Sequence, residues 1–204
     1  MVQNTEEYLA QLQIQSLLVQ ERYYRDTAQW ENLRNSYHPD ASKTAINISW
    51  FEGTAEDFVL GSKKMAESGA TSSHKICPVT IHFNENVNKA LSESTGSINL
   101  RFEYEGHEYD CVSYARFISR LQKVNGEWKM LTLEAIYDGD SITPAYPLRV
   151  PANFDLQGHR ASYRCLGWVL SRKEFQVNQD LPGTDRPETV TKFMDESHRW
   201  LKLQ

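Results

Sequence analysis

Two residues far apart in the chain carry the side chains best suited to proton transfer. Asp26 ends a long amphipathic segment and precedes Trp30 by four positions, and His74 opens a strand-like run. If the fold brings them together, the carboxylate accepts the N–H of one ring nitrogen and fixes the tautomer. The other nitrogen then faces an apolar cavity as a general base, which can move a proton without a metal or a cofactor.

The periodicity of apolar residues predicts the elements that must position this pair. Helical spacing predicts a first helix that ends near Arg25, followed by helices over residues 30–37 and 55–67. Alternating or β-branched segments then predict strands at 43–51, 74–83, 89–94, 98–104, 109–124 and 128–137. Asn125-Gly126 is a strong signal for a β-hairpin turn. Helices first and meandering strands afterwards indicate an α+β fold.

The pattern changes after Asp140. Several prolines predict an irregular connector, and two more helices are expected over residues 160–175 and 188–203. We therefore expect a domain over residues 1–140 and a helical C-terminal extension over residues 141–204. The extension is expected to pack on the sheet, close the cavity or join a dimer interface.

Composition excludes several classes of function. The 204-residue chain has a net charge of −5, so it lacks the basic surface expected of a nucleic-acid-binding protein. No apolar run approaches the ~18 residues of a membrane span, and the polar, acidic N-terminal segment is unlike a targeting peptide. Three scattered cysteines without a Cys-x-x-Cys motif predict free thiols in a reducing cytosol, and hence a cytoplasmic protein.

Motifs for bound groups are absent from the sequence. No histidine, cysteine or carboxylate cluster has metal-ligand spacing, and there is no phosphate-binding glycine motif and no Gly-x-Ser-x-Gly. We therefore expect no metal and no cofactor.

The segment around Asp26 resembles the SnoaL-like branch of the nuclear-transport-factor-2-like (NTF2-like) superfamily. The matching positions are Asp26, Trp30, Leu33 and the corner Pro39-Asp40-Ala41. The resemblance covers roughly residues 8–140 and implies an NTF2-like cone, in which a curved antiparallel sheet wraps around a long N-terminal helix. Scytalone dehydratase and hexachlorocyclohexane dehydrochlorinase are lyases of this branch.

The resemblance implies catalytic roles for Asp26 and His74. In the lyases, the Asp that precedes the Trp by four positions pairs with a His at the start of the second strand. Two departures limit the transfer. Scytalone dehydratase has a tyrosine just before the Asp, where this chain has Arg25. Its small polar pair on a later strand corresponds to positions near Ala115 and Phe117. The dehydratase mechanism therefore does not transfer whole.

Other candidates for contact with a substrate rest on position alone. Trp50 ends the first predicted strand and is expected to wall the pocket, Asn99 lies near the family's second histidine, and Tyr24 is one of the tyrosines nearest Asp26. For Trp50, a structural role in the core is an equally good interpretation.

Strand alternation defines two faces of the segment after Tyr109. Ser113 shares a face with Ala115 and Phe117, whereas Tyr114 and Arg116 lie on the other. If the odd face points inward, Ser113 is the polar group of the cavity and Phe117 contacts the substrate; a bulge would reverse this.

Three hypotheses of function follow. The first is a cofactor-free dehydratase, isomerase or cyclase that acts on an apolar small molecule of secondary-metabolite type, in a homo-oligomer that is expected to be a dimer. The second is a binding protein without chemistry, which predicts that Asp26 and His74 lie apart or are shielded from the pocket. The third is a small subunit like those of ring-hydroxylating oxygenases, which would accompany a larger iron-containing chain.

Overall fold

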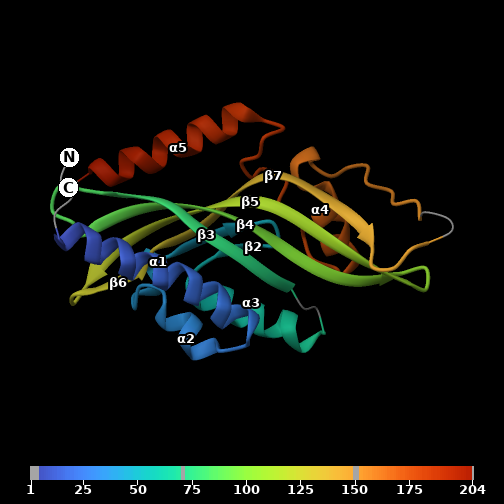
Figure 1. Cartoon of the computed structure of the whole chain (residues 1–204), viewed down its shortest axis with the longest axis horizontal. Coiled ribbons are helices and arrows are strands. Elements are labelled where there is room, and N and C mark those ends of the chain that lie inside the picture. Colours follow the sequence, from blue (N-terminus) through green and yellow to red (C-terminus); the bar gives the residue numbers. More distant parts are fainter. Residues whose placement is uncertain (1–4, 70–71, 149–151, 204) are drawn as a thin grey trace.

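The computed structural model describes residues 5–69, 72–148 and 152–203 and shows one long twisted sheet with helices on both faces (Figure 1). Its α-helices are α1 (Thr5–Asp26), α2 (Trp30–Asn35), α3 (Ala55–Glu67), α4 (Arg164–Arg172) and α5 (Pro187–Lys202). Its strands are β1 (Ala45–Ile48), β2 (Phe51–Gly53), β3 (Ser72–Phe83), β4 (Lys89–Tyr104), β5 (His107–Val124), β6 (Glu127–Met130) and β7 (Thr132–Pro144). The predicted α+β fold is therefore confirmed.

The sheet has the strand order β2-β1-β7-β5-β4-β3, and β6 pairs with β5. The β1–β7 pair is parallel, and the other pairs are antiparallel. In this order β3, which carries His74, is an edge strand. One side of β3 therefore offers backbone groups to partners outside the sheet.

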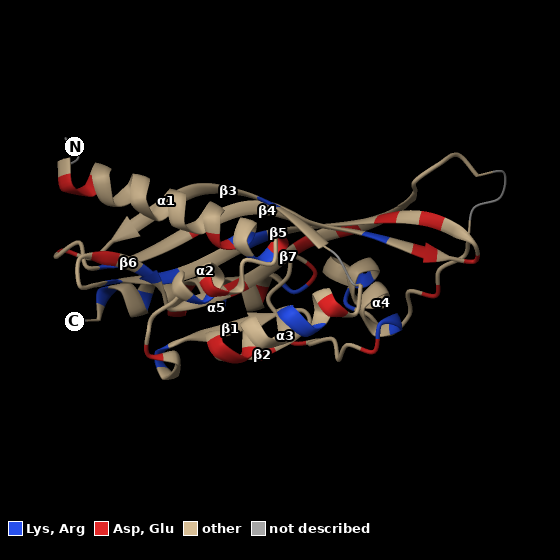
Figure 2. Cartoon of the chain, turned by 90° about the horizontal axis from the view of Figure 1, so that it is seen from below, with Lys and Arg blue, Asp and Glu red and all other residues tan. Residues whose placement is uncertain are grey.

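Helix α1 crosses the inner face of the sheet with an apolar stripe. Ala10, Ile14 and Leu18 recur every four residues and are almost fully buried. No charged residue occurs between Tyr8 and Gln20. Figure 2 shows this uncharged middle part of α1, with acidic and basic residues gathered at its C-terminal end against the sheet.

The predicted break between residues 94 and 98 was wrong, because β4 runs through it without interruption. A Cβ atom at Gly96 would lie only 2.2 Å from the backbone oxygen of Lys75 on β3. The glycine permits close approach of the two strands here, and it does not mark a turn.

The hairpin at Asn125-Gly126 is confirmed. Both residues have positive φ angles, 51° and 87°, as the tight turn between β5 and β6 requires. The segment predicted as a single strand from residue 128 to 137 divides at Leu131 into β6 and β7. The segment predicted at 43–51 similarly contains only the short strand β1 and the start of β2.

The C-terminal helices lie on opposite faces of the sheet (Figure 1). Helix α4 joins the main core, to which α1 also contributes, and its Leu166 and Leu170 are buried there. Helix α5 covers part of the outer face through a separate cluster that includes Ile118, Ile136 and Leu201. Strand β7 continues to Pro144, past the expected boundary at residue 140. The division into a domain and an extension stays a prediction.

Helix α1, at 22 residues, is not apolar enough to cross a bilayer, and neither is any other helix in the described parts of the chain. Cys77 is exposed, whereas Cys111 and Cys165 are buried, and all three are free thiols.

Candidate active site

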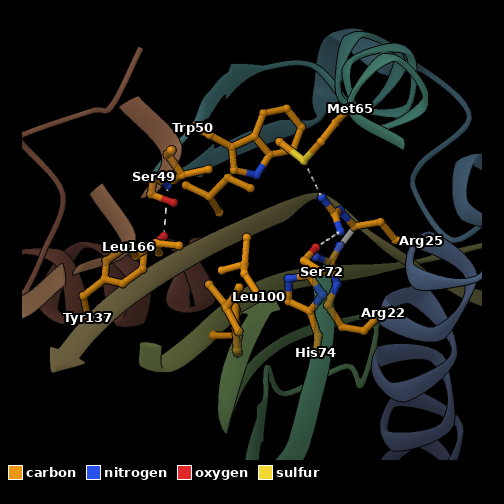
Figure 3. Close-up of a pocket in the computed structure, with 14 residues that line it drawn as sticks. Arg22, Arg25, Ser49, Trp50, Met65, Ser72, His74, Leu100, Tyr137 and Leu166 are labelled. Atoms are coloured by element: carbon orange, nitrogen blue, oxygen red, sulfur yellow. Dashed lines mark hydrogen bonds between the residues drawn. The ribbon is translucent and has the colours of Figure 1, made fainter. Parts of the chain in front are cut away.

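A cavity lies at the C-terminal end of α1, between the inner face of the sheet, the β1–β2 turn, α3 and α4 (Figure 3). Its walls are mostly apolar, with a few polar groups among them. They are formed by Arg22, Arg25, Ile48, Ser49, Trp50, Met65, Ser72, His74, Ile98, Leu100, Phe117, Tyr137, Leu166 and Leu170.

The cavity is narrow. The centre of a water-sized sphere can move through only about 30 Å³ of it. That is room for roughly two ordered waters, which each need about 10–15 Å³ by this measure. A ligand as large as an aromatic ring therefore requires side chains of the wall to move.

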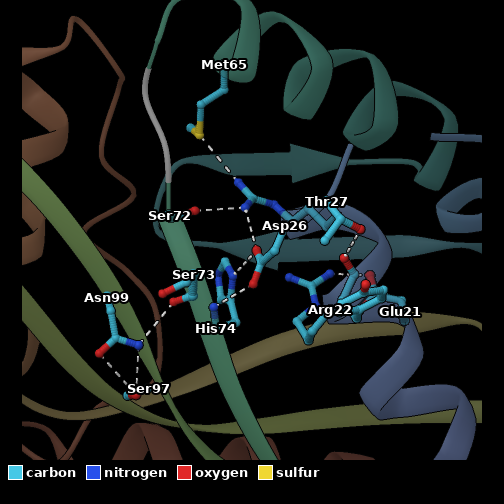
Figure 4. A network of polar contacts seen from close by, with 12 residues as sticks. Glu21, Arg22, Asp26, Thr27, Met65, Ser72, Ser73, His74, Ser97 and Asn99 are labelled. Atoms are coloured by element: carbon cyan, nitrogen blue, oxygen red, sulfur yellow. Dashed lines mark hydrogen bonds and ion pairs between the residues drawn. The ribbon is translucent and has the colours of Figure 1, made fainter. Parts of the chain in front are cut away.

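The structure brings Asp26 and His74 into direct contact. Nδ1 of His74 lies 2.7 Å from Oδ1 of Asp26, and the backbone N–H of His74 donates to Oδ2 at 2.6 Å (Figure 4). The side chain of Asp26 is only 15% exposed, and that of His74 only 7%. His74 forms part of the cavity wall, and Asp26 is not among the lining residues.

Local structure explains why one carboxylate makes both bonds. Asp26 is the last residue of α1, and His74 is the third residue of the edge strand β3. The backbone N–H of His74 points away from the sheet, so the carboxylate can take the place that a neighbouring strand would occupy. The two bonds fix the position of the imidazole ring and place the proton on Nδ1.

The electrostatics favour a neutral imidazole beside an ionised carboxylate. Burial lowers the pKa of His74 to about 4, although the hydrogen bond to Asp26 acts in the opposite direction. Burial alone would raise the pKa of Asp26, but its hydrogen bonds with His74 outweigh this and hold the pKa below its usual value. At neutral pH, Nε2 is therefore an unprotonated base.

Two buried arginines at this end of α1 also line the cavity. Arg22 is hydrogen-bonded to Glu21 through two of its nitrogens, and the hydroxyl of Tyr37 donates to the same carboxylate at 2.7 Å. The charge of Arg22 is thus matched by a neighbouring carboxylate.

Arg25 has weaker partners. Its Nη1 donates to Oγ of Ser72 at 2.8 Å and lies 3.5 Å from Oδ1 of Asp26, and its Nη2 faces the sulfur of Met65 at 3.4 Å. The guanidinium also lies over the ring of Trp50, 5.7 Å from its centroid. Burial, reinforced by the charge of Arg22, lowers the pKa of Arg25 to about 10, so it remains a cation at neutral pH.

The sequence did not identify Arg22 and Arg25 as cavity residues. A signal was present, because the apolar stripe of Ala10, Ile14 and Leu18 continues at these two positions by helical spacing. A charged residue on a core-facing stripe must find a buried partner or line a cavity.

Tyr137 on β7 is a further lining residue that the sequence did not identify. Its hydroxyl accepts the backbone N–H of Ser49 at 2.9 Å across the cavity from His74 (Figure 3). Burial raises the pKa of Tyr137 to about 12, so its phenol stays protonated.

Two of the predicted substrate-binding residues, Trp50 and Phe117, line the cavity. Tyr24 does not, because the helix turns it away from the cavity, and its hydroxyl lies 3.4 Å from Gln20. Asn99 does not either, because strand alternation places it on the outer face beside Ser73, where its Nδ2 donates to the Ser73 carbonyl at 3.1 Å.

The odd face of β5 does point inward, since Ser113, Ala115 and Phe117 are buried and Tyr114 is exposed. Ser113 nevertheless does not belong to the cavity wall. It pairs with Asp140 on β7, and its Oγ has no hydrogen-bond partner among the described residues. Inward orientation is therefore not enough to place a side chain at the cavity.

Residues 5–69, 72–148 and 152–203 contain no group of three or more His, Cys, Asp or Glu side chains arranged to hold a metal ion.

Many solved structures share this fold. A putative scytalone dehydratase from Novosphingobium aromaticivorans aligns with a TM-score of 0.54 at 20% identity, over 71% of this chain and 92% of its own. A hexachlorocyclohexane dehydrochlorinase (LinA) of type 2 aligns with a TM-score of 0.53 at 15% identity, over 72% and 96%.

Fungal sequences are more similar. A PEP2-like protein of Fusarium vanettenii is 30% identical over 167 residues, which are 80% of this chain and 70% of the relative. Pea pathogenicity protein 2 of the same fungus is 28% identical over the same shares. The SnoaL-like domain family matches residues 6–134. The chain therefore belongs to the SnoaL-like family, in the NTF2-like superfamily.

Proposed function

We propose that the chain is a general-base enzyme that removes a proton from a small molecule bound in the cavity. The observation that carries this proposal is the doubly hydrogen-bonded contact between Asp26 and His74, with His74 at the cavity wall. His74 is the base, and Asp26 orients it. The reaction belongs to the dehydration, isomerisation or cyclisation class, and the substrate is a largely apolar compound of secondary-metabolite type.

The mechanism follows from the bonds around the imidazole. Nε2 accepts the substrate's proton while Nδ1–H stays bonded to Asp26, and the carboxylate stabilises the resulting imidazolium. A positioned base of this kind contributes a factor of about 10²–10⁴ in rate. The protonated phenol of Tyr137 lines the cavity across from His74 and can donate a hydrogen bond to an oxygen of the ligand.

The contact weighs against the alternative of a binding protein without chemistry. That hypothesis predicts a pair that is separated or shielded from the pocket, whereas the two side chains are 2.7 Å apart and His74 lines the cavity. The narrow cavity supports a small substrate. Met65 is an unbranched, flexible side chain in the wall and is suited to making room for a ring.

The test uses 5-nitrobenzisoxazole, a general probe for a base in an apolar cavity. Removal of its ring C–H proton breaks the N–O bond, forms a nitrile and releases a coloured phenolate, with no metal or cofactor. We expect the wild-type chain to catalyse this elimination above the buffer rate, and His74→Gln to lose the catalysis about 100-fold or more.

His82→Gln is the matched control, because His82 lies on the same strand and its side chain is 44% exposed, outside the cavity. This variant should retain the wild-type rate. Equal rates for the wild type and His74→Gln would contradict the proposal. Native mass spectrometry of the protein mixed with extracts of its host would then identify the bound small molecule.

A further inference from the structure

In the described part of the chain, Arg25 is a buried cation without a close anionic partner. Its side chain is 7% exposed, and its only carboxylate contact among these residues is the 3.5 Å approach of Nη1 to Asp26. Both oxygens of Asp26 are already engaged by His74. The nearby carboxylate of Glu21 is engaged by Arg22 and Tyr37.

The guanidinium of Arg25 also has hydrogen-bonding capacity to spare. A guanidinium has five N–H donors, and no described residue accepts from its buried Nε. Nη2 faces the thioether of Met65, which is a weak acceptor. An oxygen with negative charge would make a shorter and stronger bond at this position.

The site therefore has a buried base, His74, and a buried cation, Arg25, whose hydrogen-bonding capacity is only partly filled by the described residues. Ser72, which holds Nη1 of Arg25, lies two residues before His74 on β3, so both side chains stand on the same face of that strand. The guanidinium also lies over the ring of Trp50. These contacts fix the cation beside the base before any ligand binds.

We propose that Arg25 holds the oxygen on which negative charge develops when His74 removes the proton, and that the substrate is a neutral carbonyl compound with a C–H bond next to the carbonyl. This inference rests on the proposed role of His74. In the step, the C–H bond breaks and its electron pair forms a carbon–carbon double bond. The carbonyl π pair moves to oxygen, giving an enolate, and the proton goes to Nε2 of His74.

The charges around the cavity match this reaction. With a neutral substrate and a neutral imidazole, the charge of Asp26 balances that of Arg25. Proton transfer creates an imidazolium against Asp26 and an enolate against Arg25, so each new charge meets a fixed opposite charge in a site with little water. Such preplaced charges stabilise a transition state because they need no reorganisation during the reaction.

The experiment uses 4-nitrophenol, whose neutral and ionised forms differ in colour and whose phenolate resembles an enolate. We expect the wild-type chain to bind it and to lower its pKa by at least about one unit, a tenfold preference for the anion. Arg25→Met should abolish this shift. The substitution removes a buried charge and keeps an unbranched side chain, so the fold should survive, and thermal unfolding checks this.

Three control variants test whether the pKa shift of the phenol depends on the charge of Arg25 and not on another arginine or on His74. Arg25→Lys keeps the charge and should retain part of the shift. Arg116→Gln removes an arginine that pairs with Asp138 away from the cavity, and should retain all of it. His74→Gln should also retain the shift, because Arg25 is intact, although it loses the elimination.

Failure of wild-type binding, or an equal phenol pKa in wild type and Arg25→Met, would overturn the role of Arg25 and leave the role of His74 standing. Tighter Arg25-dependent binding of 4-nitrobenzoate than of 4-nitrophenol would show that the site takes a permanent carboxylate, and would overturn the neutral substrate class. If His74→Gln kept the wild-type elimination rate and the lowered pKa of the bound phenol, the role of His74 as the base would instead be overturned.

Discussion

Two polar clusters lie side by side at the end of α1, and they differ in how completely their groups are partnered. In the closed cluster of Glu21, Arg22 and Tyr37, each charge or hydroxyl has a direct partner. In the open cluster of Arg25, Asp26 and His74, Nε of Arg25 has no partner among the described residues, and His74 faces the cavity. The first arrangement is suited to stability and the second to chemistry.

The largest expected effect comes from breaking the closed cluster. Glu21→Gln leaves the buried Arg22 without its counter-charge, and we expect a loss of about 3–5 kcal/mol in the free energy of unfolding. Denaturant unfolding monitored by tryptophan fluorescence measures this. A loss below about 1 kcal/mol would show that the closed cluster contributes little to stability, and would contradict the contrast between the two clusters.

Breaking the open cluster should instead affect the rate. In Asp26→Asn the amide can donate to Nδ1, which moves the ring proton to Nε2 and removes the base. We expect elimination of 5-nitrobenzisoxazole to fall about 100-fold, or about 2.7 kcal/mol in the barrier. Unfolding measured in parallel should show a smaller loss of stability than in Glu21→Gln.

Tyr37→Phe sharpens the comparison within the closed cluster. It removes one hydrogen bond to an ionised carboxylate and leaves the charge pair intact, so we expect a loss of about 1.5–3 kcal/mol in unfolding free energy. The wild-type elimination rate at 25 °C should persist in the folded variant. A rate loss as large as that of Asp26→Asn would show that the closed cluster takes part in the chemistry.

The open cluster should also set the pH dependence. Because the pKa of folded His74 is about 4, below its ordinary value of 6.5, the unfolded chain binds more protons between these two values. This residue's contribution to stability should therefore be complete above pH 6.5 and decline as the pH falls toward 4. The elimination rate should stay level from pH 8 to about 5. A rate that halves near pH 6.5 would contradict the lowered pKa.

The smallest effect is expected outside both clusters. Ser113→Ala removes a buried hydroxyl that has no partner in the described part of the chain and does not line the cavity. We expect an unchanged elimination rate and a change in unfolding free energy within about 0.5 kcal/mol. A tenfold rate loss would place Ser113 in the site after all.

The sequence predicted well what local patterns determine. The span of α3 and the turn at Asn125-Gly126 agree with the structure because capping, helical spacing and positive φ are properties of short segments. The proximity of Asp26 and His74 was expected from the family resemblance, and the structure confirms their contact. Their catalytic roles stay a prediction.

Features set by tertiary packing were harder to predict. The alternation of β4 could be read from the sequence, but which of its faces points into the cavity could not, so Asn99 was placed on the wrong side. Gly96 resembles a strand end in sequence, and only the approach of β3 explains it. The importance of Arg25 depends on which acceptors surround it, and these come from α1, α3 and β3.

The bond from the backbone of His74 to Asp26 also bears on aggregation. An unpaired N–H on the border of a sheet is a place where a second molecule can add a strand of its own. Asp26 occupies that donor and puts a negative charge beside it, so the carboxylate that orients the imidazole also discourages fibril-like stacking of chains.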